Sequence, residues 1–335
     1  LACWISSHSP NNIKMVQVPD IAVMTSLIQL IQLAADPTSQ DQRIQNPEVL
    51  TDSTLDCNSV QFYLVTRTNA NYGGIEACLQ QTTTLFNGTF NESKPTKILV
   101  HGWRNSRKTE FTTNITDSYL NAMDVNVIQV DWSAIAEEDY ITARLAVPNV
   151  GKTVAAFIEK ITKELQVSLS DLQLVGHSLG AHVVGVAGYT FQNPKIGTVT
   201  GLDPAGPLFW TTQNDGMITE ESGEFVVILH TCAGLLGTSK VLGHVDFYAN
   251  GGIPIQPGCG IDLLGFCSHE RAIYLYGEAL ENPTAFNAVE CNSYTSYKNG
   301  NCNANNRTYF GGDVDRSASG KYYFQTSSSF PFTLS

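Results

Sequence analysis

One short stretch constrains the fold more than any other part of the chain. In LQLVGHSLGAHVVGVAG, residues 172–188, a short apolar run passes through the pentapeptide GHSLG into a longer apolar run. The first run predicts a buried strand and the second a helix. Glycines on both sides of a serine let the chain reverse sharply, so that the serine Oγ stands exposed at the carboxyl edge of the sheet. The context predicts that Ser178 is a nucleophile, whereas the pentapeptide alone fits an ordinary turn equally well.

The alternation of strand and helix continues along the chain from residue 60 onward. Strands that alternate with helices imply a parallel sheet covered on both faces, so we predict an α/β protein. The expected strands are VQFYLVTRT (60–68), TKILVHGW (96–103), VNVIQVDW (125–132), LQLVGHS (172–178), IGTVTGLD (196–203), EFVVILHT (224–231) and VDFYANGG (245–252). The expected helices are 147–165, a segment from Leu179, and CSHERAIYLYGEAL (267–280), and the tail YYFQTSSSFPF (322–332) looks β-like.

The first 56 residues differ from the rest of the chain. They are polar except for IAVMTSLIQLIQLAA (21–35), which has the pattern of an amphipathic helix. We interpret residues 1–56 as an N-terminal extension packed on the main body and residues 57–335 as a single α/β domain. A chain of 335 residues is long enough for one large domain with a substantial core.

The charge of the chain argues against nucleic acid and anionic membranes as partners, and its apolar content argues against a membrane span. The formal net charge is −12 at pH 7, which disfavours binding to nucleic acid or to strongly anionic membranes. No apolar run approaches the ~20 residues of a membrane span, so we expect a soluble protein.

Cysteines and glycosylation sequons indicate an oxidising compartment. The chain has eight cysteines and four Asn-x-Ser/Thr sequons, a combination typical of secreted proteins with disulfides. It begins with Leu1 and shows no signal peptide, as expected if one has been removed. We therefore predict a secreted glycoprotein, with candidate glycosylation sites at Asn87, Asn91, Asn114 and Asn306.

Two backbone amides are candidates for an oxyanion hole. Leu179 directly follows the serine at a predicted helix N-terminus, where a backbone N–H is free. The strand in LVHGWRNS (99–106) ends in His-Gly, which makes the N–H of Trp103 the candidate for a second donor. We interpret His101, in the same stretch, as a residue that holds the loop through hydrogen bonds and not as a base.

Where such a turn carries the nucleophile of a catalytic triad, the acid of the triad and then its histidine follow the serine along the chain. Asp203, in TVTGLDPAGPLF (198–209), lies just after an apolar strand and before a proline that ends it. Asp246 lies within an expected strand and Asp262 in a loop between cysteines, where either could be only a hydrogen-bonded polar group. We choose Asp203 as the acid.

His269 is the preferred base. It lies in CGIDLLGFCSHERA (259–272), directly after a loop bounded by two cysteines. A neutral imidazole takes up the serine proton near pH 7, and Asp203 would fix its tautomer. His244, and with less support His230, remain alternatives because they also follow Asp203.

As an ordered series, these residues resemble a known family. ILVHGW, VIQVDWS, GHSLGAHVVGVAG, GLDPAGPLF, HVDFYANGG, PGCG and CSHERA match, in order, motifs of the animal pancreatic lipase family, which includes insect neutral lipases and wasp-venom phospholipases A1. The likeness covers about residues 60–330. The series is far more specific than the pentapeptide.

The resemblance implies an α/β-hydrolase fold, with a mostly parallel central sheet and helices on both faces. It also implies Ser178 as nucleophile, Asp203 as acid, His269 as base, and the amides of Trp103 and Leu179 as the oxyanion hole. The C-terminal β-sandwich of vertebrate pancreatic lipase is absent from the pattern, so no colipase partner is implied. We predict no metal ion and no cofactor.

Two loops that cover the acyl site in the full lipases are short here. The resemblance identifies Cys259 to Cys267 as the base of the lid, yet only the seven residues GIDLLGF separate these cysteines. HTCAGLLGTSKVLG (230–243) is likewise compact and resembles the phospholipase A1 branch. We therefore expect an open cleft suited to phospholipids or other polar lipids, with weak interfacial activation.

The remaining cysteines and the N-terminal segment also differ from the family pattern. Cys232 stands where the family usually has a polar residue after His-Thr, and WISSHSPNNIKMVQVPD (4–20) resembles the extension of insect relatives. We expect a bridge between Cys291 and Cys302, whereas three pairings stay open among Cys3, Cys57, Cys78 and Cys232.

Two function classes follow from these observations. The first is a secreted serine hydrolase of lipid esters, either phospholipase A1-like or a short-lid neutral lipase, that works through an acyl-enzyme. The second is a non-catalytic carrier or storage protein on the same fold, as in insect yolk proteins, that holds a lipid or pigment. Three intact triad positions favour the enzyme.

The expected partners follow from both function classes. We expect a lipid substrate or bound apolar ligand, and we allow for a lipid interface. We predict no nucleic-acid partner, and the sequence does not give the oligomeric state.

Overall fold

The computed structural model describes residues 4–6, 13–15, 54–70, 73–81, 85–209 and 216–334. Two short antiparallel strands, β1 (Trp4–Ser6) and β2 (Ile13–Met15), lie within residues 1–56, the predicted N-terminal extension. The amphipathic helix expected at 21–35 and Cys3 fall outside the described residues.

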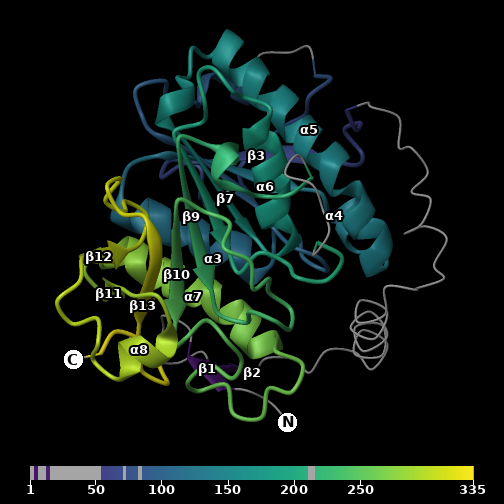
Figure 1. Cartoon of the computed structure of the whole chain (residues 1–335). Coiled ribbons are helices and arrows are strands. Elements are labelled where there is room, and N and C mark those ends of the chain that lie inside the picture. The colour runs from purple at the N-terminus through teal and green to yellow at the C-terminus, as the bar shows by residue number, and fades with distance from the viewer. Residues whose placement is uncertain are drawn as a thin grey trace.

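One large sheet organises the rest of the described chain (Figure 1). Its strands, in chain order, are β3 (Gln61–Val65), β4 (Ile75–Ala77), β5 (Thr96–Val100), β6 (Asn126–Asp131), β7 (Leu172–His177), β8 (Thr198–Leu202), β9 (Phe225–His230), β10 (Val245–Ala249), β11 (Phe286–Glu290), β12 (Arg307–Phe310) and β13 (Gly320–Phe324). In space their order is β12-β11-β13-β10-β9-β8-β7-β5-β6-β3-β4. Of the described strands, β13 comes last along the chain, yet it lies inside the sheet, between β10 and β11.

The strands from β13 to β6 in this order run parallel to one another. Antiparallel strands border them on both sides, with β3 and β4 beyond β6 and β11 and β12 beyond β13. A mostly parallel sheet with this order and helices on both faces is the α/β-hydrolase fold, which confirms the predicted fold class.

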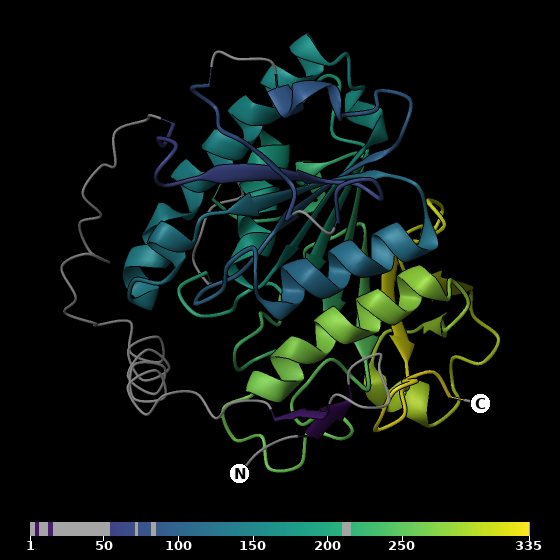
Figure 2. The same cartoon turned by 180° about the vertical axis from the view of Figure 1, so that it is seen from behind.

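Long helices cover both faces of the sheet. α3 (Glu110–Ala122) and α7 (Phe266–Glu281) lie side by side on one face, and α5 (Tyr140–Glu164) and α6 (Leu179–Tyr189) pack together on the other (Figures 1 and 2). The shorter helical segments are α4 (Ser133–Ala136), α8 (Tyr294–Lys298), η2 (Leu85–Gly88), η3 (Leu169–Asp171) and η5 (Glu220–Ser222). Across the described parts of the chain, every helix is too short or too polar to cross a lipid bilayer.

The central strands contribute to two apolar cores at once. In β5, Ile98 and Val100 belong to the core under α5 and α6, whereas Leu99 belongs to the core under α3 and α7. Successive side chains of a strand point to opposite faces, so a strand covered on both sides is apolar without interruption. For this reason the central strands appear in the sequence as short apolar runs.

α5 begins at Tyr140 and not at the expected residue 147. The reason is a cap: Oδ1 of Asp139 accepts the N–H groups of Ile141 and Thr142 at 3.1 and 3.2 Å, which satisfies two donors of the first turn. Pro148 lies inside the helix, although proline more often marks a helix start.

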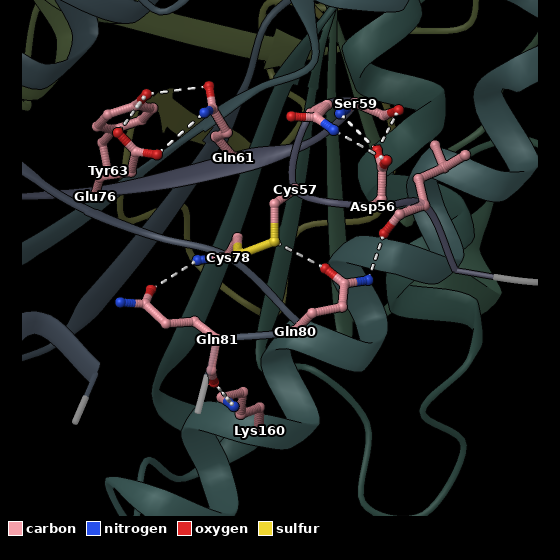
Figure 3. The surroundings of a disulfide bond; sticks show 12 residues. Asp56, Cys57, Ser59, Gln61, Tyr63, Glu76, Cys78, Gln80, Gln81 and Lys160 are labelled. Carbon is pink, nitrogen blue, oxygen red and sulfur yellow. Dashed lines mark hydrogen bonds between the residues drawn. A yellow bond between two sulfur atoms is a disulfide. The ribbon is translucent and has the colours of Figure 1, made fainter. Parts of the chain in front are cut away.

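A disulfide between Cys57 and Cys78 joins the chain before β3 to the chain after β4 (Figure 3). This settles part of the pairing that the sequence left open. Close by, the carbonyl oxygen of Gln81 accepts a hydrogen bond from Nζ of Lys160 at 2.8 Å. Since Lys160 belongs to α5, the loop after β4 is attached to that helix.

Candidate active site

Ser178 stands at a tight turn between β7 and α6. Its backbone angles are φ 57° and ψ −122°, a conformation that residues other than glycine rarely adopt and that is typical of functional sites. The flanking glycines are required by space. A Cβ on Gly176 would lie 2.2 Å from the carbonyl oxygen of Gly180, and one on Gly180 would lie 2.1 Å from that of Val100. The turn thus has the form that the pentapeptide predicts.

Asp203 and His269 form a buried pair. Asp203 directly follows β8, and its Oδ2 accepts a hydrogen bond from Nδ1 of His269 at 2.6 Å. Its Oδ1 accepts the backbone N–H groups of Thr231 and Cys232 at 2.8 and 3.0 Å. These bonds hold the carboxylate against the imidazole and leave Nε2 as the ring nitrogen that can take up a proton.

Ser178 and His269 line one pocket of about 270 Å³. They are only 9% and 8% exposed, so a ligand reaches them by entering this pocket. Ser178 and Asp203 directly follow the parallel strands β7 and β8, and His269 reaches the same carboxyl edge of the sheet from α7. The rest of the lining is apolar at Trp103, Tyr140, Ala205, Pro207, Leu236 and Phe266 and polar at Arg104, Asn105, His177 and Glu270.

The loop after β5 runs directly past Ser178. A Cβ on Gly102 would lie 2.8 Å from Cβ of Ser178, so this approach requires a glycine. The next residue, Trp103, lines the pocket, and its indole N–H donates to the carbonyl oxygen of Glu138 at 2.8 Å. Leu179 is the first residue of α6, where a backbone N–H has no acceptor within the helix. Of the two candidate oxyanion donors, Leu179 directly follows Ser178, and Trp103 directly follows the glycine that packs against it.

His101 holds the loop after β5, in agreement with the sequence interpretation. Its Nδ1–H donates to the carbonyl oxygen of Gly102 at 3.0 Å, and its Nε2 accepts the N–H of Trp132 at 3.2 Å. The indole N–H of Trp132 in turn donates to the His101 carbonyl oxygen at 2.8 Å. His101 is fully buried.

Sequence reasoning missed a contact between His177 and the candidate base. Nε2–H of His177 donates to the carbonyl oxygen of His269 at 3.1 Å, and the two ring centroids lie 4.5 Å apart. Burial, and secondarily the neighbouring His269, lowers the pKa of His177 well below its usual value. The ring is therefore neutral at pH 7 and acts as a hydrogen-bond donor. The only signal in the sequence is its position directly before Ser178.

Glu270, which also lines the pocket, is a second residue that sequence reasoning missed. Burial, followed by the nearby carboxylate of Glu110, raises the pKa of Glu270 to about 7. This carboxyl group therefore changes its charge near neutral pH, beside the imidazole of His269.

The alternative acids and bases have other partners. Nε2 of His230 lies 2.7 Å from Oδ1 of Asp246, and both side chains are fully buried. Asp262 accepts two backbone N–H groups at the start of α7, at 3.2 and 2.8 Å. Nδ1 of His244 accepts a backbone N–H at 3.1 Å. None of these four residues is among those that line the pocket.

The short loop between Cys259 and Cys267 is closed by a disulfide and leads into the first turn of α7. Two apolar residues on this loop, Ile261 and Leu263, are 68% and 79% exposed. The structure also contains the expected disulfide between Cys291 and Cys302, after β11.

Cys232 is a buried free cysteine. Its thiol donates to the carbonyl oxygen of Gly265 at 3.3 Å, which links the loop after β9 to the residue before α7. Burial, and secondarily the carboxylate of Asp203, raises the pKa of the thiol, so the group stays protonated and unreactive at neutral pH.

The sequon asparagines differ in exposure. Asn91 and Asn306 are exposed, and Asn114 is half-buried on α3. The side chain of Asn87 lies outside the described part of the structure.

The chain is similar in sequence to several known proteins. The family described as Lipase matches residues 26–332. Lipoprotein lipase from Neovison vison is 35% identical over 284 residues, which are 76% of this chain and 59% of that protein. Pancreatic lipase-related protein 3 from Homo sapiens is 37% identical over 268 residues, 73% of this chain and 56% of that protein. Phospholipase A1 member A from Bos taurus is 34% identical over 276 residues, 80% of this chain and 59% of that protein.

The chain spans somewhat less than three-fifths of the length of these curated relatives, between 56% and 59%. The family match extends over nearly all of the sheet and its helices. On these grounds the chain belongs to the lipase family, the family of pancreatic lipase.

Proposed function

We propose that this protein is a secreted hydrolase of lipid esters, of the phospholipase A1 or short-lid lipase type. The observation that carries the proposal is the hydrogen bond of 2.6 Å between Asp203 and His269 beside a pocket that Ser178 also lines. Membership of the lipase family supports the substrate class. Three disulfides support a secreted protein, because such bonds persist in oxidising compartments.

In the proposed reaction, Oγ of Ser178 attacks the carbonyl carbon of the ester while Nε2 of His269 takes the hydroxyl proton. The electron pair of the carbonyl moves to its oxygen, and the amides of Trp103 and Leu179 stabilise the resulting oxyanion. Collapse breaks the bond to the alcohol oxygen, which receives the proton from His269 and leaves an acyl-enzyme. Water then attacks in the same way and releases the fatty acid. Asp203 keeps the imidazole oriented throughout.

The shortness of the loop at 260–266 favours polar lipids as substrates. Its seven residues are tied at both ends by the Cys259–Cys267 disulfide, and of these seven only Phe266 lines the pocket. A substrate then enters without a lid having to open, and a lipid with a bulky headgroup is not excluded by one.

Labelling with a fluorophosphonate ester tests the proposal. The wild-type protein should gain the mass of one phosphonyl group on Ser178, and the Ser178→Ala variant should gain none. Folded protein that takes up no label would contradict the hydrolase and favour the carrier on the same fold, which solvent extraction would then reveal through a bound lipid or pigment.

A further inference from the structure

The active-site pocket carries one cationic side chain that lacks a carboxylate partner. Arg104 is the only lysine or arginine in the lining. Within the described ranges, its guanidinium contacts the ring of Trp103, 5.3 Å from the centroid, and forms no ion pair. The chain as a whole has 31 acidic and 19 basic residues. We therefore asked what a cation without a carboxylate partner contributes to this pocket.

The backbone at Arg104 is held in a conformation that arginine does not favour. Its φ is 56°, in the left-handed region where glycine and asparagine are commonest. The N–H of Arg104 donates to the carbonyl oxygen of Ala136 at 2.9 Å, which fixes the direction of the chain here. Strained backbone of this kind persists mainly where a site depends on it.

Trp103 gives the guanidinium a rigid support. Its indole N–H is bound by the carbonyl oxygen of Glu138, and its ring meets the ring of Tyr140 edge-on, with centroids 5.3 Å apart. A guanidinium over such a ring is attracted by the π electrons, and its N–H groups, which lie in the plane of the guanidinium, stay free to donate. This contact favours one orientation of the exposed guanidinium, two residues beyond the glycine that lies against Ser178.

We infer that Arg104 binds the phosphate of the phospholipid whose ester reacts at Ser178, and that it thereby selects phospholipids over neutral glycerides. This inference rests on the proposed hydrolase function. A phospholipid carries its phosphodiester anion on the same glycerol as the reacting ester, and a guanidinium binds phosphate through paired N–H bonds. A neutral glyceride offers no anion to Arg104.

The acidic residue in the same lining does not cancel this preference. Glu270 is the only aspartate or glutamate among the lining residues, and its pKa of about 7 leaves it partly protonated at neutral pH. The guanidinium keeps its full charge at every pH of interest. At neutral pH the lining therefore carries a full positive charge on Arg104 and only part of a negative charge on Glu270.

Monomeric substrates test the inference without a lipid surface. We would compare kcat/KM for dihexanoyl phosphatidylcholine and for dihexanoylglycerol, both below their critical micelle concentrations, in wild type, Arg104→Gln and Arg104→Lys. Lys108→Gln is the matched control, because Lys108 is an exposed cation on the same loop but outside the pocket lining. Turnover of p-nitrophenyl butyrate reports whether each variant keeps an intact site.

Arg104→Gln should lose roughly tenfold or more in kcat/KM on the phospholipid, the worth of a hydrogen bond to a charged group, and should keep its rate on the glyceride and on p-nitrophenyl butyrate. Arg104→Lys should recover part of the loss, and Lys108→Gln should change neither rate. An equal loss on both lipids, no loss on the phospholipid, or a loss seen with vesicles but not with monomers would overturn the inference. Failure of the wild type to hydrolyse any ester would instead contradict the proposed function.

Discussion

At the scale of single residues, Asp203 accepts three hydrogen bonds, from the ring of His269 and from two backbone amides. In an Asp203→Asn variant the new NH₂ group faces an N–H donor, so the imidazole must turn or change tautomer. We expect kcat for p-nitrophenyl butyrate to fall by ~10³–10⁴ while the near-ultraviolet circular dichroism is unchanged. A folded variant within tenfold of wild type would argue against the assignment of the acid.

Glu270 predicts a pH dependence of stability. Its pKa is about 7 in the folded protein, against an ordinary value of 4.5, because of burial and secondarily Glu110. Between these two values the folded state binds more protons than the unfolded state, so the free energy of unfolding falls as pH rises, by an order of ~1–3 kcal/mol in total. Glu270→Gln should remove that fall in urea titrations from pH 5 to 8. The exposed Glu137→Gln is the control, and an unchanged slope in Glu270→Gln would contradict the prediction.

At the scale of elements, the early start of α5 depends on its cap. Asp139→Ala removes the side chain that accepts two N–H groups of the first turn and should lower the free energy of unfolding by ~0.5–2 kcal/mol. Asp124, whose carboxylate meets Lys94 on the surface, gives the matched control, because loss of an exposed ion pair costs ~1 kcal/mol or less. Urea unfolding measures both, and an equal loss in the two variants would mean that the cap is not what fixes the helix start.

Two disulfides of similar span should differ in their effect on the candidate site. The Cys259–Cys267 bond encloses the loop that leads into α7 two residues before His269, whereas Cys291–Cys302 follows β11 near the edge of the sheet. Replacing either pair by serines should cost roughly 2–3 kcal/mol of stability. Only the first double variant should also lower kcat/KM, measured well below both melting temperatures. Equal activity in the two variants would show that the loop does not position the base.

At the scale of the whole molecule, the net charge of −12 predicts a preference among lipid surfaces. An acidic protein is repelled by an anionic bilayer, and salt screens the repulsion over about 10 Å at 0.1 M. Hydrolysis of zwitterionic phosphatidylcholine vesicles should therefore be several-fold faster than that of vesicles rich in phosphatidylserine at low salt, with the gap closing as salt is added. A gap that salt leaves unchanged would point to headgroup chemistry in the pocket as its cause.

The central strands were predictable because burial on both faces makes them apolar throughout, as in β7 and β9. The candidate nucleophile and acid follow such strands directly, so their positions could be read from the sequence. α3 was not predicted, because EFTTNITDSYLNA is mostly polar or β-branched and has few large apolar residues. Its stability comes from tertiary packing on α7, where the hydroxyl groups of Tyr119 and Tyr276 meet at 2.7 Å.

Contacts between distant parts of the chain also escaped prediction. The bond from His177 to the carbonyl oxygen of His269 joins residues 92 positions apart, and no local pattern marks it. The strands β11 and β12 lack the uninterrupted apolar runs of the central strands, and every second residue of β12 is exposed. Such strands form because a neighbouring strand supplies the partners for their backbone hydrogen bonds. This pairing cannot be seen in the residues of the strand itself.

The place of β13 between β10 and β11 has a consequence for biosynthesis. The ribosome delivers this strand after its two neighbours, so the sheet stays open there until Gly320–Phe324 have been synthesised. A product of premature termination before Gly320 would expose the unpaired edges of both neighbours, and such edges recruit other chains. Variants with a stop codon between Glu290 and Gly320 should accordingly accumulate as aggregates or be degraded during quality control, even though every proposed triad residue has been translated.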